Sequence, residues 1–163
     1  MLTHERLKEV LSYDRDTGLF HWRVATAHRI TVGDIAGAIG HYGYRIIGID
    51  GKSYRANRLA WFYMTGSWPI AEIDHEDTDR SNDAFRNLRE ATESQNAANG
   101  KLRSTNTSGL KGVSWDKEKR KWVAGIKIDY KRKMLGRFDK KEDAHKAYLI
   151  AAEKLFGQFA RAA

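Results

Sequence analysis

The chain has 163 residues, of which 41% are hydrophobic and 11% aromatic, which is enough to build a core and excludes wholesale disorder. It contains no cysteine, so disulfides and thiolate metal sites are excluded, and we expect one or two small domains in an intracellular protein. The net charge of +8 favours a polyanionic partner. The charged N-terminal residues predict neither a signal peptide nor a membrane span.

Positive charge is concentrated in the C-terminal part of the chain. Residues 1–100 hold 12 Lys+Arg and 14 Asp+Glu, whereas residues 101–163 hold 17 Lys+Arg and 7 Asp+Glu. Lysine is segregated in the same way, with 12 of the 14 lysines after Gly100. A compact basic module beside a near-neutral one predicts attachment to nucleic acid, although a highly charged solvated surface is the alternative.

Short helices and strands are expected along the first part of the chain. Thr3 is a suitable N-cap for the first helix, and Asp50-Gly51 suits the type I′ turn of a hairpin. Gly66 and Pro69 end the second helix. The expected elements are a helix over 2–11, a strand over 19–24, hairpin strands over 42–49 and 52–55, and a helix over 56–64. The pattern assigns no element to residues 25–41.

Residues 70–99 are dense in acids and asparagines and contain one histidine, His75. Phosphodiester hydrolysis needs a base for the attacking water, and a neutral imidazole suits that task near neutral pH. It also needs positive charge on the leaving oxygen, which a hard divalent cation supplies. Mg²⁺ accepts one or two protein oxygen ligands and keeps several waters. The composition of this segment therefore predicts a metal-dependent hydrolytic centre.

Four side chains of this segment have suitable positions for such a centre. Asp74 and His75 are neighbours, and on a strand they would point to opposite faces, one toward an ion and one toward a water. Residues 92–95 form a capping box that opens a short helix, and Asn96 lies in its first turns. Asn87 starts a second short strand, where its amide can bridge backbone groups.

This set of residues resembles the HNH endonucleases of the ββα-metal fold, most closely the phage-type homing endonucleases, over roughly residues 54–99. The resemblance implies that His75 is the general base and that Asp74 and Asn96 bind the metal, Mg²⁺ or Mn²⁺. It also implies that Asn87 holds the connecting loop and so orients His75. Asn99 shares a helix face with Asn96 and is the rival ligand.

Alternatives remain for the individual residues of the centre. Any one of them alone is better explained by a turn or by a backbone hydrogen bond, and only the joint pattern favours a nuclease. Asp77, Asp79 and Asn82 lack the spacing and the terminal glutamate of a calcium loop. Phage relatives carry a histidine where this chain has Asn57, and activity is expected to fall if that histidine contacts substrate.

The last part of the chain predicts a small sheet followed by a helix. Residues 100–108 are polar and without periodicity, so they predict a boundary between two modules. Asp139 is expected to cap the helix, with Glu142 completing a capping box, and Gly157 to end it. The expected elements are strands over 111–115, 121–128 and 133–138 and a helix over about 140–156.

Residues 108–160 resemble the APETALA-type DNA-binding domain of plant ethylene-response factors, which phage HNH nucleases often carry. Two usual arginine positions are lysines and Gly125 replaces a polar contact residue, which favours phosphate anchoring over base reading. Trp122 and Phe138 are assigned to the core, while Trp115 fits either core or DNA equally. The residues expected to bind DNA are Lys111, Trp115, Lys127, Arg132 and Lys133.

Together these patterns predict a two-domain α+β protein. Residues 1–100 would form a ββα-metal HNH nuclease domain, and residues 101–163 a three-stranded antiparallel sheet packed on one helix. The expected activity is that of a homing endonuclease on double-stranded DNA, leaving a 5′-phosphate, in the cytoplasm of the host cell if the protein is phage-encoded. A non-cleaving DNA-binding regulator with a decayed nuclease and an RNA-binding module are the alternatives. No membrane or protein partner is expected. Because the chain has no long heptad run, we expect a monomer or a weak dimer.

Overall fold

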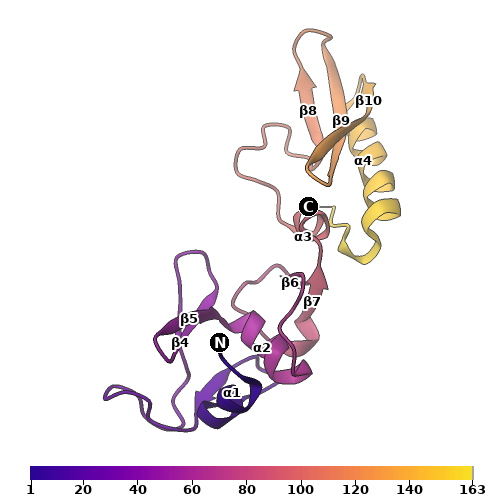
Figure 1. The fold of residues 1–163 in the computed structure, drawn as a ribbon. Coiled ribbons are helices and arrows are strands. Elements are labelled where there is room, and N and C mark those ends of the chain that lie inside the picture. Colours follow the sequence, from indigo (N-terminus) through magenta and orange to yellow (C-terminus); the bar gives the residue numbers. More distant parts are fainter. Residues whose placement is uncertain (163) are drawn as a thin grey trace. The chain divides into compact units, whose positions relative to one another are not determined.

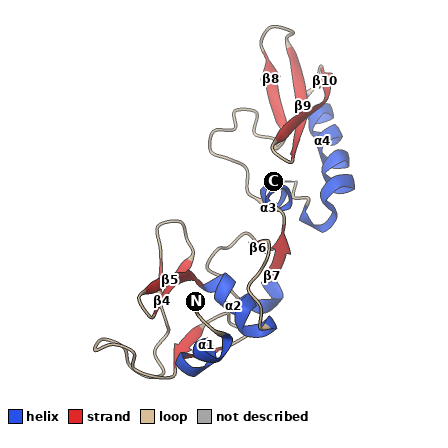
Figure 2. Ribbon diagram, in the orientation of Figure 1, coloured by secondary structure: helices blue, strands red, loops and turns tan. Residues whose placement is uncertain are grey.

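The computed structural model describes residues 1–162, which fall into two compact units, Met1–Glu90 and a second unit that begins at Ala91. We call them the N-terminal unit and the C-terminal unit (Figure 1). Both combine helices with strands, so the fold class is α+β as predicted (Figure 2). The units divide earlier than residue 100, because α3 (Glu93–Asn99) packs against α4 (Lys141–Phe156) and η2 (Gly157–Phe159) of the C-terminal unit.

The N-terminal unit consists of short elements joined by long turns. Its strands form a two-stranded β1–β2 sheet, a three-stranded sheet in the order β3-β4-β5, and a β6–β7 pair whose second strand runs past the unit boundary. The elements are α1 (His4–Val10), β1 (Leu11–Tyr13), β2 (Phe20–Trp22), β3 (Ala38–Ile39), β4 (Arg45–Ile49), β5 (Lys52–Arg55), α2 (Ala56–Thr65), β6 (Glu72–His75), η1 (Phe85–Asn87) and β7 (Leu88–Ala91).

The core of this unit lies between the two helices and the small sheets. Leu7 on α1, Phe20 on β2 and Leu59 on α2 are completely buried in one apolar cluster. Thr3 caps α1 by accepting a hydrogen bond from the Arg6 amide, as predicted. The Asp50-Gly51 turn has positive φ at both residues, as the predicted type I′ hairpin requires. This core holds α2 in place directly before the strand β6.

The C-terminal unit is a three-stranded antiparallel sheet, in the order β10-β9-β8, with α4 packed on one face (Figure 1). Ile126 of β9 is buried in one cluster with Tyr148 and Ala152 of α4. Gly112 has φ +74°, and a Cβ there would lie 2.1 Å from the Tyr148 ring, so a side chain is excluded. The further elements are α3 (Glu93–Asn99), β8 (Val113–Asp116), β9 (Lys121–Ile128), β10 (Lys131–Phe138), α4 (Lys141–Phe156) and η2 (Gly157–Phe159).

Three details of the C-terminal unit differ from the sequence-based expectation. Strand β8 begins at Val113, two residues later than expected, because Gly112 has a positive φ and the Val113 amide bonds the Leu110 carbonyl in a turn. Asp139 does not cap α4: the N-cap is Lys140, without a side-chain hydrogen bond, because the Asp139 carboxylate pairs with Lys121. Strand β10 begins at Lys131, two residues earlier than expected, because the hairpin turn is the pair Asp129 and Tyr130, both with positive φ. Over the described residues, no helix has the length and apolar character needed to cross a membrane.

Candidate active site

The strand β6 carries Asp74 and His75 and is anchored by the first turn of α2. The Asn57 amide nitrogen donates to the Ile73 carbonyl at 3.1 Å, and its oxygen accepts from the Arg58 amide at 2.9 Å. Arg58 donates in turn to the carbonyls of Pro69 and Ala71, which lead into β6. Asn57 is therefore a buried structural residue: its amide nitrogen holds the strand, and its amide oxygen bonds the first turn of α2.

His75 forms a buried pair with an acid from the following loop. Its Nε2 lies 2.9 Å from Asp83 Oδ1, and the two residues are only 4% and 1% exposed. Burial raises the pKa of the Asp83 carboxyl, and the hydrogen bond with His75 opposes that rise. With Asp83 ionised, Nε2–H donates to it and the lone pair of the neutral imidazole is on Nδ1. The pair thus selects one tautomer of His75.

Asp74 is also buried, at 5% exposure, but it has a different partner. Its Oδ2 accepts a hydrogen bond from Arg89 Nε of β7 at 3.0 Å, and Arg89 Nη1 lies 3.9 Å from the more exposed Glu76. A carboxylate buried to this degree is costly unless positive charge lies beside it. Arg89 supplies that charge from the neighbouring strand of the β6–β7 pair.

Asn87 connects both ends of the loop between β6 and β7. Its side-chain oxygen accepts from the Asp77 amide at 3.1 Å, and its nitrogen donates to Asp77 Oδ1 and to the Asn82 carbonyl at 3.0 and 2.8 Å. Its own carbonyl accepts from the Glu76 amide at 2.9 Å. Burial would raise the pKa of the Asp77 carboxyl, but hydrogen bonds from Asn82, the Asp79 amide and Asn87 lower it below its ordinary value.

Asn96 and Asn99 lie on α3, in the C-terminal unit. The predicted capping box is present, with Thr92 and Gln95 bonded reciprocally at the start of this helix. Asn96 is half-buried and Asn99 is buried. The structure brings His75 together with Asp83, and Asn87 together with its loop, in the N-terminal unit, whereas Asn96 and Asn99 belong to the C-terminal unit.

The described residues contain no group of three or more histidines and acids that could hold a metal ion. A hard cation does not require one, because Mg²⁺ takes one or two protein oxygens and completes its shell with water. A buried carboxylate such as Asp74 and an amide such as Asn96 are oxygen donors of the appropriate kind. The donor chemistry of the chain therefore fits a magnesium-type ion.

Sequence reasoning did not identify Asp83 and Arg89 as members of the site. Asp83 lies in a loop with Asp77 and Asp79, and the sequence offers no signal that it alone of these acids is buried. Arg89 follows Asn87 by two residues on β7, and pairing of β7 with β6 is what brings it to Asp74. Pairing of the two strands would have been enough to place Arg89 beside Asp74, whereas Asp83 can be identified only from the folded loop.

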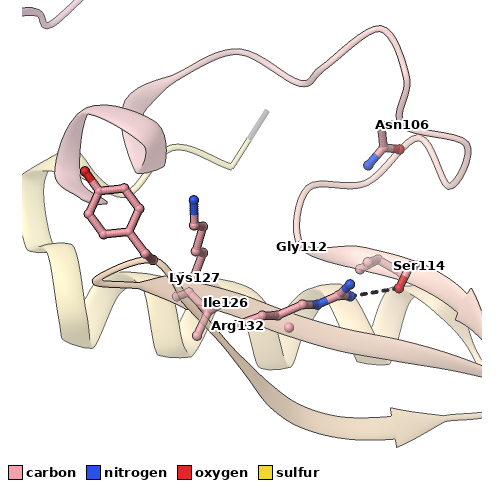
Figure 3. A pocket seen from close by; sticks show the side chains of 9 residues that line it. Asn106, Gly112, Ser114, Ile126, Lys127 and Arg132 are labelled. Carbon is pink, nitrogen blue, oxygen red and sulfur yellow. Dashed lines mark hydrogen bonds between the residues drawn. The ribbon is translucent and has the colours of Figure 1, made fainter. Parts of the chain in front are cut away.

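The face of the C-terminal sheet away from α4 is open, and two of the predicted cations lie on it. Cross-strand partners share a face, and β9 pairs Lys127 with Arg132 of β10. Arg132 donates to Ser114 Oγ at 3.0 Å and lies over Gly125, where a Cβ would be 2.9 Å from its Nε (Figure 3). These residues border a pocket of about 340 Å³ on the sheet (Figure 3).

The other three residues predicted to bind DNA are placed differently. Lys133 pairs with buried Ile126 and Trp115 with Trp122, so both lie on the α4 side of the sheet. Trp115 is nevertheless 44% exposed, with its ring 4.9 Å from that of Trp122. Lys111 donates to the carbonyls of Ala98 and Gly100, and burial lowers its pKa to about 8. These three do not join Lys127 and Arg132 on the open face.

Arg137 is a cation of the open face that the list of expected DNA-binding residues omitted. It pairs with Val123 of β9, two positions along β9 from Gly125, and its Nε donates to Asp116 at 3.1 Å. Together with Arg132 and Met134 it lines a second shallow pocket, of about 350 Å³. Simple alternation would not have identified it, because Arg132 and Arg137 are five positions apart and alternation places them on opposite faces; the register shift between Met134 and Gly136 brings Arg137 to the open face.

Comparisons with known proteins find two family segments, one after the other along the chain. Residues 54–98 match the model of an HNH endonuclease family, and residues 108–158 match that of the AP2 domain. The chain is 42% identical over 111 residues to Protein 3.8 of Escherichia phage T7, an alignment that covers 68% of this chain and 91% of that protein. The printed name of the phage protein states no activity. No solved structure matches the chain significantly.

Proposed function

The chain belongs to the family of Protein 3.8 from Escherichia phage T7, with an HNH endonuclease segment followed by an AP2 segment, and we propose that it is a metal-dependent DNA endonuclease. In this proposal residues 1–100 hydrolyse a phosphodiester bond and residues 101–163 hold the DNA. The substrate is double-stranded DNA, as for a phage-type homing endonuclease, and the product carries a 5′-phosphate. The protein would act in the cytoplasm of the host cell, as a monomer or weak dimer.

The buried His75–Asp83 pair is the observation that carries the proposal. Asp83 accepts from Nε2–H, which leaves Nδ1 as the basic nitrogen that takes a proton from the attacking water. The ionised carboxylate also stabilises the imidazolium that forms when His75 accepts this proton. His75 is thus the catalytic base, and Asp83 positions it.

Asp74 and Asn96 are the proposed ligands of the ion, Mg²⁺ or Mn²⁺. When bound, the ion supplies positive charge to the phosphate oxygens and the leaving 3′ oxygen. Asp74 contributes a buried carboxylate on the strand that also carries His75, so ligand and base are held in fixed relation by one element. Arg89 orients the Asp74 carboxylate through the hydrogen bond at 3.0 Å.

Asn87 is proposed to act on catalysis through the loop that carries Asp83. Its amide and carbonyl bind the loop at Glu76, Asp77 and Asn82, one residue before Asp83. A loop fixed at these points holds the Asp83 carboxylate at a constant position against His75. Asn87 is therefore a positioning residue, which acts on His75 only through the loop and Asp83.

The open face of the C-terminal sheet is the proposed surface for DNA. Lys127 and Arg132 lie side by side across β9 and β10, and Arg137 extends the same face. A two- or three-stranded sheet can enter the major groove, where such cations reach phosphates or guanine edges. Of the five residues expected to bind DNA, only Lys127 and Arg132 lie on this face, and the proposal rests on these two. The other three, Lys111, Trp115 and Lys133, lie elsewhere.

A supercoiled-plasmid assay with the full chain tests the proposed function. Nicked or linear product is expected with Mg²⁺ or Mn²⁺ and none with chelator. His75→Ala is expected to remove cleavage while leaving duplex binding intact. His28→Ala, at an exposed histidine of the same unit, is the matched control and should cut like the wild type.

Two results would reject the nuclease. Undiminished cleavage by the His75→Ala variant would show that the base lies elsewhere. DNA binding without any metal-dependent cleavage by the wild type would leave a non-cleaving DNA-binding protein. Competition between duplex DNA and structured RNA at one salt concentration separates a DNA-binding from an RNA-binding protein, because affinity for either polymer changes steeply with salt.

A further inference from the structure

Tyr44, which directly precedes β4, lies beside the His75–Asp83 pair. Its ring centre is 5.9 Å from that of the His75 imidazole, and its side chain is half-buried. The hydroxyl forms none of the hydrogen bonds found among the described residues, so the ring itself is the part in use. Whatever binds against this ring is close to the proposed base.

Two arginines from different parts of the chain lie against this one ring. Arg55, at the end of β5, places its guanidinium carbon 4.5 Å from the Tyr44 ring centre, and Arg80 places its own at 5.0 Å. Arg80 also donates from Nη1 to the Tyr42 carbonyl at 3.1 Å. Its stem runs beside Gly43, where a Cβ would be 3.7 Å from Arg80 Cβ. Both guanidinium groups are thus held in place by contacts.

Neither of the two charges is taken up by an ion pair in the part of the chain that the structure describes. Among the described residues neither Arg55 nor Arg80 forms an ion pair, although residues 1–100 contain more acids than bases. Two like charges beside one ring repel each other, and an anion between or beside them offsets that repulsion. Guanidinium groups suit phosphate in particular, because their planar donors match its oxygens in pairs.

We propose that Arg55 and Arg80, held by Tyr44, bind backbone phosphates of DNA beside the bond on which His75 acts. The inference rests on the proposed nuclease function and extends it, because it gives the N-terminal unit its own grip on the DNA strand. The C-terminal sheet then sets overall affinity, while the Arg55–Tyr44–Arg80 cluster fixes the reacting strand against the His75–Asp83 pair.

The salt dependence of duplex binding tests this contact without relying on cleavage. The full chain with His75→Ala is used throughout, so that bound DNA stays intact, and Arg55→Gln with Arg80→Gln is compared with that background. Each phosphate contact contributes about 0.9 to the slope of log affinity against log salt, so the double variant should lower the slope by about 1.8. Arg29→Gln, at an exposed arginine of the same unit, should leave the slope unchanged.

Two substitutions at Tyr44 test the role of the ring. Tyr44→Phe keeps the aromatic surface and should retain the full slope, whereas Tyr44→Leu should lower it in part because both guanidinium groups lose their support. An unchanged slope in a folded Arg55→Gln, Arg80→Gln variant overturns the proposal. Equal slopes for the Phe and Leu variants overturn the role of Tyr44.

The outcome is separable from that of the proposed function. If the wild type does not cut DNA, but the double arginine variant has a lower salt slope, the phosphate site is supported and the nuclease function is rejected. If cleavage depends on His75, but the double arginine variant has an unchanged salt slope, the nuclease function is supported and the phosphate site is rejected. Melting curves of each variant confirm that it is folded, and phosphate-ethylation interference on the wild type gives a second reading that needs no substitution.

Discussion

The N-terminal unit buries the side chains of its proposed chemistry, whereas the C-terminal unit leaves its cations on an open sheet. Asp74, His75, Asp83 and Asn87 are all buried, and each is held by a hydrogen bond from another element or loop. Lys127 is exposed and Arg132 is held by one bond to Ser114. Burial and hydrogen bonds fix the geometry in the first unit, and exposure permits salt-dependent, adaptable binding in the second.

This difference separates two kinds of sensitivity to mutation. Groups that act through a fixed geometry lose function when a single hydrogen bond is changed, even if no volume is lost. Groups that act through charge in solvent lose function gradually, one contact at a time, and the loss depends on ionic strength. Substitutions of matched size can tell these two behaviours apart.

The largest effect is expected for Asp83→Asn in the N-terminal unit. The new amide donates to Nε2 and so puts the imidazole proton on Nδ1, the nitrogen that must be unprotonated to act as the base. Cleavage should therefore fall by about 10²- to 10⁴-fold with DNA binding unchanged. Nitrogen chemical shifts of the His75 ring should report the exchanged tautomer. Asp16→Asn, at an exposed turn, is the control. A normal rate with an altered tautomer would remove Asp83 from the mechanism.

A smaller effect is expected on the open face of the C-terminal sheet. Replacing Lys127 and Arg132 by glutamine should remove two phosphate contacts, so the drop in affinity between about 50 and 200 mM salt should shrink by roughly tenfold. Lys133→Gln changes the same charge on the other side of the sheet and should have little effect. If Lys133→Gln weakens binding as much as Lys127→Gln, the strand register does not define the DNA surface.

The smallest effect is expected for Asp77→Asn in the loop tied by Asn87. The pKa of Asp77 is lowered in the folded protein, so its contribution to stability is present above the ordinary value of 3.8 and lost as the pH falls through the folded value. The difference in unfolding free energy between wild type and variant should be constant above about pH 5 and shrink below pH 4, and should not exceed about 1 kcal/mol for so exposed an acid. Urea titrations from pH 3 to 6 measure it. A difference that grows on acidification would contradict the hydrogen-bond assignment.

The sequence predicted local structure well wherever the signal was itself local. The Thr3 cap, the Asp50-Gly51 turn and the capping box of Thr92 and Gln95 each depend on residues a few positions apart, and each is present. The Asp139 cap failed because Lys121, 18 residues away, takes that carboxylate. A competing long-range partner is not visible in a local pattern.

The same limit applied to the candidate site. Asp74 and His75 were recognisable as adjacent residues, but their partners Arg89 and Asp83 come from pairing of strands and from folding of a loop. On the C-terminal sheet, a count of cations included Lys133, which the register assigns to the α4 side. Strand pairing and side-chain burial decide which charged residues share a surface. Neither can be deduced from a list of residue types.

The most direct test of the account is the single-turnover cleavage rate of the His75→Ala variant, measured with the DNA fully bound and Mg²⁺ present. The imidazole is proposed as the proton acceptor, so the rate should fall at least as far as that of Asp83→Asn, by about 10²- to 10⁴-fold, while the fraction of bound DNA stays equal to that of the wild type. A variant that binds equally and cuts at the wild-type rate would contradict the central claim that the buried His75–Asp83 pair activates the attacking water.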